Sequence, residues 1–162
     1  MKNSFIKYLT VLGLWSISFA SFGQQNDFWS LIEGEWKGTG NLFGASASFE
    51  MSWSNELNAN FVKLEFKNSF ERSGQTYEMT ALAMYKVSGE SISGTWFDSR
   101  GQVLPLKSEL IGDVLTTYWG DEKTEKGKTT YSLESMEMIV VQDFVMKEGE
   151  YQLFGQASYD KK

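Results

Sequence analysis

The feature that most constrains the fold is a strict alternation of apolar and polar side chains along most of the chain. From Ala45 to Ser54, apolar residues occupy every second position and serine or glutamate residues lie between them. Further along, Val62, Leu64 and Phe66 alternate with charged residues. Successive side chains of a β-strand point to opposite faces of its sheet, so this period of two is typical of strands that bury one face. The pattern predicts an all-β chain.

About ten segments behave in this way, and short sequences rich in Gly, Ser, Asn and Asp separate them. The predicted strands are Glu35–Leu42, Ala45–Ser54, Val62–Lys67, Tyr77–Val87, Ser91–Phe97, Gln102–Leu110, Val114–Trp119, Lys128–Leu133, Met136–Met146 and Glu150–Tyr159. Because the connections are short, we expect antiparallel neighbours. One helical turn is predicted at Asn26–Ile32, where Asn26 or Asp27 could cap its first turn.

Periodicity alone does not choose between two packed sheets and one closed barrel. The segment Tyr77–Val87 carries large apolar residues on both alternating sets. Strands of a sandwich can have this composition, and so can barrel strands that line a ligand cavity. Closure would remove the exposed sheet edges. From the residues alone both architectures stay open.

The first residues of the chain have the order of a secretory signal peptide. Lys2 and Lys7 give a basic start, and the apolar stretch Tyr8–Ala20 follows. This stretch is shorter than the roughly 20 residues of a helix that spans a bilayer. A cut before Gln24 places small residues at the expected spacing, and a cut after Ala20 is the alternative.

We therefore expect residues 1–23 to be a signal peptide and residues 24–162 to form one exported domain, in the periplasm or outside the cell. A buried N-terminal helix is the less favoured interpretation. The sequence has no cysteine, so no lipid anchor is expected at the cut, and the core must form without a disulfide. No later segment is apolar for long enough to predict a membrane-spanning helix.

The absence of histidine and cysteine removes several kinds of function. It excludes thiol chemistry, a nucleophile activated by histidine, and zinc or iron–sulfur sites of the usual kind. A net charge of −6 disfavours a nucleic-acid partner, because phosphate backbones bind basic surfaces. The mixed-charge run Asp121–Lys128 lacks the ligand order of a calcium loop. We expect no metal and no cofactor.

Two glycine–tryptophan motifs carry a resemblance to a known superfamily. The first, Gly34-Glu35-Trp36-Lys37-Gly38, opens the first predicted strand, and the second, Gly94-Thr95-Trp96-Phe97-Asp98-Ser99-Arg100-Gly101, lies mid-chain. The chain resembles the calycin superfamily of lipocalins, fatty-acid-binding proteins and their relatives. Within it, the chain is most similar to a group of bacterial secreted lipocalin-like domains of unknown function. The resemblance implies a single antiparallel up-and-down β-barrel with a short N-terminal helical turn.

Haem-binding relatives of the nitrobindin type share the first motif and a ten-stranded barrel. They hold iron through a histidine near the C-terminus, and this chain has no histidine. Their function therefore does not carry over. Tyr118, Tyr151 or Tyr159 could replace the histidine as an iron ligand, but this alternative is disfavoured.

The resemblance gives the first motif a structural role. It implies that Trp36 packs across the closed end of the barrel, as large buried aromatic residues usually do. Gly34 and Gly38 are expected to allow close backbone approach or a bend.

A ligand inside the barrel would contact aromatic and methionine side chains, which together form an adaptable apolar surface. The same residues would fill a dry core equally well, and the sequence does not decide between the two. The candidate ligand-binding residues are Trp53, Trp96, Trp119, Met51, Met79, Met84, Tyr85, Tyr118 and Arg100, with Met136 and Met138 as further apolar candidates.

Arg72 and Arg100 are the only arginines of the chain. An arginine inside a barrel can bind a ligand carboxylate through two parallel hydrogen bonds. Both residues, however, lie beside turn-forming sequences, so solvated turn residues are the favoured interpretation.

Three functions remain, and we expect them in this order. The first is an exported lipocalin-like protein that binds a small, largely apolar molecule inside the barrel. The second is an isomerase or hydrolase that uses Tyr, Glu or Lys in place of histidine, with an interior titratable group of shifted pKa. The third is a module without a cavity that binds a glycan or a protein through exposed aromatic residues.

Overall fold

The computed structural model describes residues 28–162 of the chain, and ten β-strands make up most of them. The strands are β1 (Gly34–Leu42), β2 (Ala45–Glu56), β3 (Phe61–Arg72), β4 (Gln75–Ser88), β5 (Ser91–Asp98), β6 (Val103–Ile111), β7 (Val114–Trp119), β8 (Gly127–Ser135), β9 (Met138–Lys147) and β10 (Glu150–Lys161). They agree closely with the predicted segments. The main difference is β3, which continues beyond its predicted end at Lys67 to Arg72.

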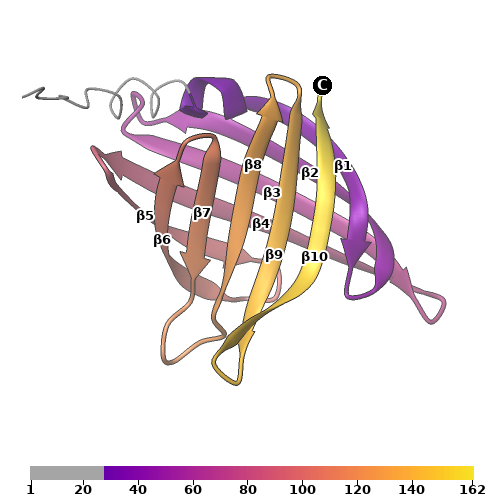
Figure 1. The fold of residues 1–162 in the computed structure, drawn as a ribbon. Coiled ribbons are helices and arrows are strands. Elements are labelled where there is room, and N and C mark those ends of the chain that lie inside the picture. Colours follow the sequence, from indigo (N-terminus) through magenta and orange to yellow (C-terminus); the bar gives the residue numbers. More distant parts are fainter. Residues whose placement is uncertain (1–27) are drawn as a thin grey trace, which may run out of the picture.

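Each strand pairs antiparallel with its neighbours in the chain, and β1 pairs with β10, so the sheet closes into an up-and-down barrel (Figure 1). The closing register runs from Trp36 opposite Lys161 to Leu42 opposite Gly155. Closure leaves no strand of the described chain with an unpaired edge. The predicted all-β, single-barrel fold is confirmed.

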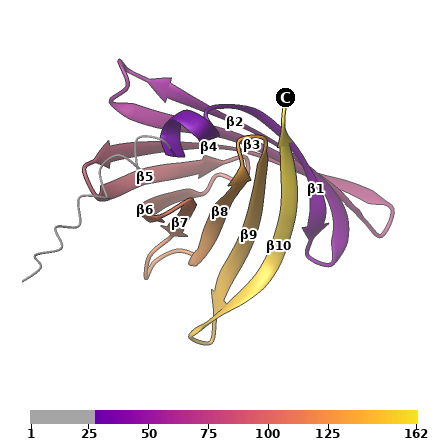
Figure 2. The same ribbon diagram turned by 45° about the horizontal axis from the view of Figure 1, so that its top comes forward.

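A short helix at residues 28–32 lies at one end of the barrel, beside the C-terminus (Figures 1 and 2). Phe28 and Ile32 of this helix are buried. The Trp36 indole Nε1 donates a hydrogen bond of 2.8 Å to the Ile32 carbonyl, which ties the helix to β1. The predicted signal peptide and the capping residues Asn26 and Asp27 lie outside the described residues.

Aromatic side chains fill the half of the barrel next to the helix. The Trp53 ring lies 5.7 Å from Tyr85 and 5.3 Å from Tyr131, and Trp29 of the helix lies 6.3 Å from Trp53. Trp36, Trp53 and Tyr85 are at most 1% exposed. This end is therefore a packed core rather than a ligand cavity.

Gly38 lies where β1 crosses the buried ring of Tyr159 on β10. A Cβ atom at Gly38 would lie 2.7 Å from the Tyr159 ring, closer than real Cβ contacts come. The glycine therefore allows β1 and β10 to meet with an aromatic ring between them, which is the close approach expected of a strand glycine.

We expect Gly38→Ala to lower the free energy of unfolding by about 1–3 kcal/mol, because the added methyl group overpacks the closing seam. Thr39→Ala, on the outer face of the same strand, is the matched control and should change it by less than about 0.5 kcal/mol. Urea unfolding followed by circular dichroism measures both. An equal effect of the two changes would contradict the close approach.

None of the described helices is long and apolar enough to cross a membrane.

Candidate functional site

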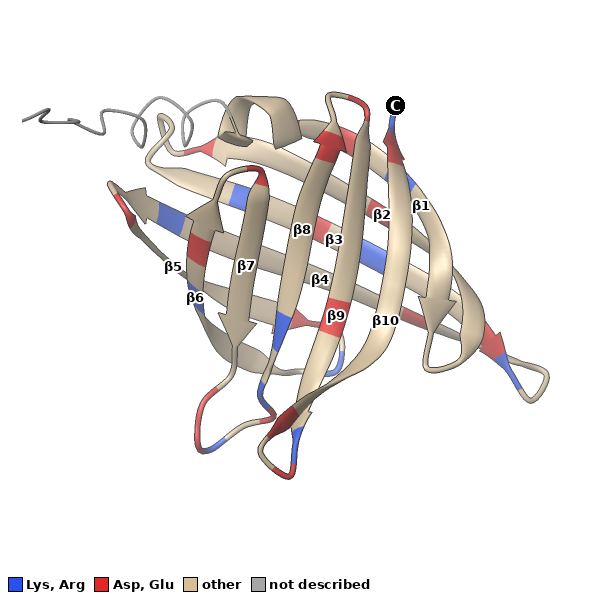
Figure 3. Ribbon diagram, in the orientation of Figure 1, with Lys and Arg blue, Asp and Glu red and all other residues tan. Residues whose placement is uncertain are grey.

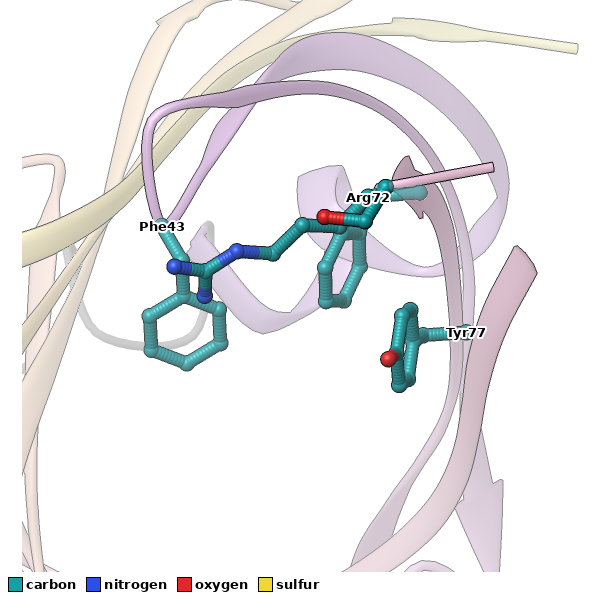
Figure 4. A pocket seen from close by; sticks show the side chains of 5 residues that line it. Phe43, Arg72 and Tyr77 are labelled. Atoms are coloured by element: carbon teal, nitrogen blue, oxygen red, sulfur yellow. The ribbon is translucent and has the colours of Figure 1, made fainter. Parts of the chain in front are cut away.

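The candidate site is a pocket of about 420 Å³ at the end of the barrel away from the helix, within the usual size range of ligand pockets. Phe43 in the β1–β2 turn forms one side of it. Phe70 and Arg72 at the end of β3, Ser73 in the following turn, and Tyr77 on β4 form the rest (Figure 4).

Three aromatic residues line this pocket, and each belongs to a stacked pair, with Phe154 packing behind Phe43. Phe70 and Tyr77 lie 5.3 Å apart with their planes 17° from parallel. Phe43 and Phe154 lie 5.1 Å apart with their planes 18° from parallel. Phe43 also lies 6.0 Å from Phe70, so the two pairs are continuous. The walls therefore offer flat apolar faces to a ligand.

Phe43 is held in place although its side chain is 56% exposed. Its backbone N–H donates a hydrogen bond of 2.7 Å to the Phe154 carbonyl. Its φ of 52° lies in the left-handed region, which a bulky residue adopts only at an energetic cost. Gly44 also has a positive φ, as a two-residue hairpin turn requires at both positions, so the turn holds an exposed aromatic residue over the pocket.

Arg72 is the only charged side chain of the pocket lining. Its guanidinium extends across the pocket toward Phe43, while Tyr77 stands on the opposite side (Figure 4). Among the ion pairs of residues 28–162, none includes Arg72. Its charge is therefore available to a ligand.

Arg100, the other arginine, is neutralised by its neighbours. Its guanidinium lies 2.7 Å from the Asp98 carboxylate and 2.9 Å from that of Glu125. Burial by itself raises the pKa of Asp98, but hydrogen bonds from Arg100, Trp96 and two backbone amides outweigh it and lower that pKa. Arg100 organises the β5–β6 turn.

A second polar feature is Asp143 on β9, which points into the barrel. Thr129 donates a hydrogen bond of 2.6 Å to its carboxylate, and Trp119 donates one of 3.3 Å to the Thr129 hydroxyl. Burial raises the pKa of Asp143 from its ordinary value of 3.8 to about 6, although the Thr129 bond acts in the opposite direction. A Cβ at Gly155 would lie 3.1 Å from the other carboxylate oxygen.

The predicted ligand-binding residues are spread over three different places. Met51, Trp53 and Tyr85 are buried in the core on the helix side of the barrel. Trp96, Trp119 and Met79 belong to the inward-facing sets of their strands and are partly buried. None of the predicted residues is part of the pocket lining, and ligand contact by the inward-facing ones stays a prediction.

Met84 and Tyr118 lie on the outer face of the barrel. Met84 alternates with the buried Ala83 and Tyr85. Tyr118 is 38% exposed and donates a hydrogen bond of 2.9 Å to Glu109 on the neighbouring strand. The alternation turns both side chains away from the interior, so a ligand inside the barrel would not contact them. Met136 is a turn residue.

Sequence reasoning missed Phe43, Phe70 and Tyr77 as pocket residues. The signal was the alternation itself: with β3 extended to its true end, Phe70 and Arg72 fall in phase with the buried Leu64. A predicted end at Lys67 hid this phase. Phe43 has no comparable signal, because it lies in a turn.

Within the part of the chain that the structure describes, no group of three or more acidic residues is placed to hold a metal ion.

Neither a protein-family model nor a curated protein sequence matches this chain. Among solved structures, the S-type phycobiliprotein lyase CPES from Guillardia theta is similar, with a TM-score of 0.56 at 6% sequence identity. The match covers 86% of this chain and 92% of the lyase chain. At this identity the likeness concerns the fold alone, and the barrel described here has a calycin-like fold.

Proposed function

We propose that this protein is an exported lipocalin-like protein that binds a small, largely apolar molecule at the end of the barrel away from the helix. The observation that carries the proposal is the pocket of about 420 Å³ lined by three aromatic residues, Phe43, Phe70 and Tyr77. Aromatic walls with few polar groups are typical of small-molecule sites. The likeness to a phycobiliprotein lyase supports a barrel that takes up a small ligand.

The two motifs support membership of the bacterial secreted lipocalin-like group. In the first motif, Trp36 fixes the helix at the end of the barrel and Gly38 allows the contact with β10. In the second motif, Asp98 accepts hydrogen bonds from Trp96 and from the Arg100 backbone amide, which shapes the β5–β6 turn. Both motifs therefore stabilise the barrel, and the residues that line the pocket determine which ligand binds.

The neutral fluorescent probe N-phenylnaphthylamine tests the binding proposal. We expect saturable binding with enhanced fluorescence, and Tyr77→Ala should weaken it by about tenfold, because one aromatic wall is lost. Tyr77 is 45% exposed, so the change should leave the fold intact. The matched control is Tyr151→Ala, which removes a 40% exposed tyrosine elsewhere on the barrel. Absence of binding, or equal loss in both variants, would contradict the proposal.

Export is tested separately by the mass of the protein recovered from its own host. A mature chain that begins at Gln24, or after Ala20, is expected. Recovery of a chain that retains residues 1–23 in the cytoplasm would overturn this part of the proposal.

A second candidate function, acid–base catalysis, has Asp143 in its favour. A carboxyl group with a pKa of about 6 can both accept and donate a proton near neutral pH. Its hydrogen-bonded neighbours are Thr129 and, through Thr129, Trp119, and none of the three residues lines the pocket described above. If the protein is only a binder, Asp143→Asn should leave affinity for the neutral probe unchanged.

A further inference from the structure

We propose that the natural ligand of the pocket is an acid: a flat apolar or aromatic body that carries one anionic group, which Arg72 binds. This inference rests on the pocket proposed above and adds the chemical class of its occupant.

The first step in the argument is the contrast between the two arginines. Arg100 has two carboxylate partners within 3 Å, at 2.7 and 2.9 Å. Arg72 has none among residues 28–162, although the chain carries 21 acidic residues against 15 basic ones. Figure 3 shows acidic and basic positions side by side at the tip of the β3–β4 hairpin, where Glu71 precedes Arg72. Even that neighbour forms no ion pair with it.

The alternation of β3 explains why Glu71 does not neutralise Arg72. Phe70 and Arg72 lie on the inward-facing set of β3, and Glu71 lies on the outward-facing set. Successive side chains of a strand point to opposite faces, so the carboxylate and the guanidinium diverge. The fold therefore directs one cation, without its counter-ion, toward the pocket.

The second step is the surroundings of the guanidinium. Apart from Ser73, the other pocket-lining residues are the aromatic residues Phe43, Phe70 and Tyr77. The Tyr77 hydroxyl donates a hydrogen bond of 3.0 Å to Gln75, so it already has an acceptor. Arg72 is exposed, so water surrounds its charge until a ligand binds. A ligand body seated on the rings would displace part of this water and strengthen the attraction to an anionic group, and a guanidinium matches a carboxylate or sulfonate with paired N–H donors.

The third step is the shape of the space. The two rings within each stacked pair lie within 20° of parallel, at 17° and 18°, while Phe43 and Phe70, which join the pairs, are tilted by 54° to each other. Ring faces bind flat ligand groups by offset stacking. A flat body packed against one of these ring surfaces would lie beside Arg72, which crosses the pocket, so an acidic substituent on it could reach the guanidinium (Figure 4). The class that fits both features is an aromatic or polycyclic acid.

Two probes that differ only in one anionic group test the inference. N-Phenylnaphthylamine is neutral, and anilinonaphthalene sulfonate adds a sulfonate to the same rings. We expect the unaltered protein to bind the sulfonate at least about tenfold more tightly than the neutral probe. Arg72→Met should abolish this preference, measured as the ratio of the two probe affinities within the same variant. Arg72→Lys should restore part of the preference, because it keeps the charge without the planar fork.

The control variant is Lys147→Met, which removes one positive charge at the β9–β10 turn at the same end of the barrel. It should retain the preference, because exposed charges outside the pocket are screened by salt. If Lys147→Met reduces the preference as much as Arg72→Met, the effect is one of overall charge and the inference is wrong. If the neutral probe binds but the sulfonate gives no preference, the inference fails and the binding proposal stands. If neither probe binds, the binding proposal itself fails.

Discussion

Trp36→Ala is expected to lower the free energy of unfolding by about 3–5 kcal/mol, a large fraction of the roughly 5–15 kcal/mol that stabilises an ordinary domain. The side chain is fully buried. Its ring lies under the Lys161 ammonium, 5.1 Å from the ring centroid, and its Nε1 holds the Ile32 carbonyl of the helix. Truncation would remove the apolar contacts, the cation–π contact and the hydrogen bond together. Urea unfolding followed by circular dichroism measures the loss.

Trp36→Phe distinguishes the contribution of the buried aromatic ring to stability from that of the indole N–H group. It keeps most of the buried apolar surface but leaves the Ile32 carbonyl without its donor, which costs about 1–3 kcal/mol. We expect a loss well below that of the alanine variant. Equal stability of Trp36→Ala and the unaltered protein would show that the helix and β1 do not depend on this residue.

Asp143→Asn is expected to stabilise the protein at about pH 7.5, by about 1–3 kcal/mol. The pKa of Asp143 is raised to about 6 in the folded protein from 3.8. The folded state thus holds this proton more tightly than the unfolded state. As the pH rises from about 4 through 6, ionisation of the buried carboxyl group destabilises the fold, and asparagine avoids this cost. The amide oxygen can still accept the hydrogen bond from Thr129.

The stabilisation by Asp143→Asn should depend on pH, which distinguishes a raised pKa from other causes. At about pH 4 and below, the carboxyl group is mostly protonated in the folded state, so the variant and the unaltered protein should have similar stabilities. Asp160→Asn, on the exposed outer face of β10, removes the same charge and is the control. A stabilisation by Asp143→Asn that did not change with pH would contradict a raised pKa as its cause.

How far the sequence predicts this structure is clear from β2 and β3. The alternation in β2 predicts both the strand and its buried face, including Met51 and Trp53. In β3 the same alternation continues to Arg72, but Asn68 and Ser69 interrupt its composition and hide the extension. Asn68 is buried in the barrel, an exception to the apolar pattern that the alternation does not predict.

The candidate site, in contrast to the strands, could not be predicted from the sequence. Tryptophan and methionine content directs attention to the middle of the strands, where these residues fill the packed core. The pocket instead combines two turns and the ends of β3 and β4, with Phe154 behind Phe43. Phe43 and Phe154 are far apart in the chain and meet because β1 pairs with β10. No local pattern encodes that meeting.

The sequence by itself determined the strands and their buried faces, because alternation and turn chemistry act between residues close in the chain. The resemblance added the closed barrel and the structural role of the first glycine–tryptophan motif. Only the tertiary structure decided that the aromatic core lies on the helix side, and that Arg72 faces a pocket while Arg100 is neutralised. These depend on the pairing of the first strand with the last and on side chains from distant turns. Both are set by long-range packing.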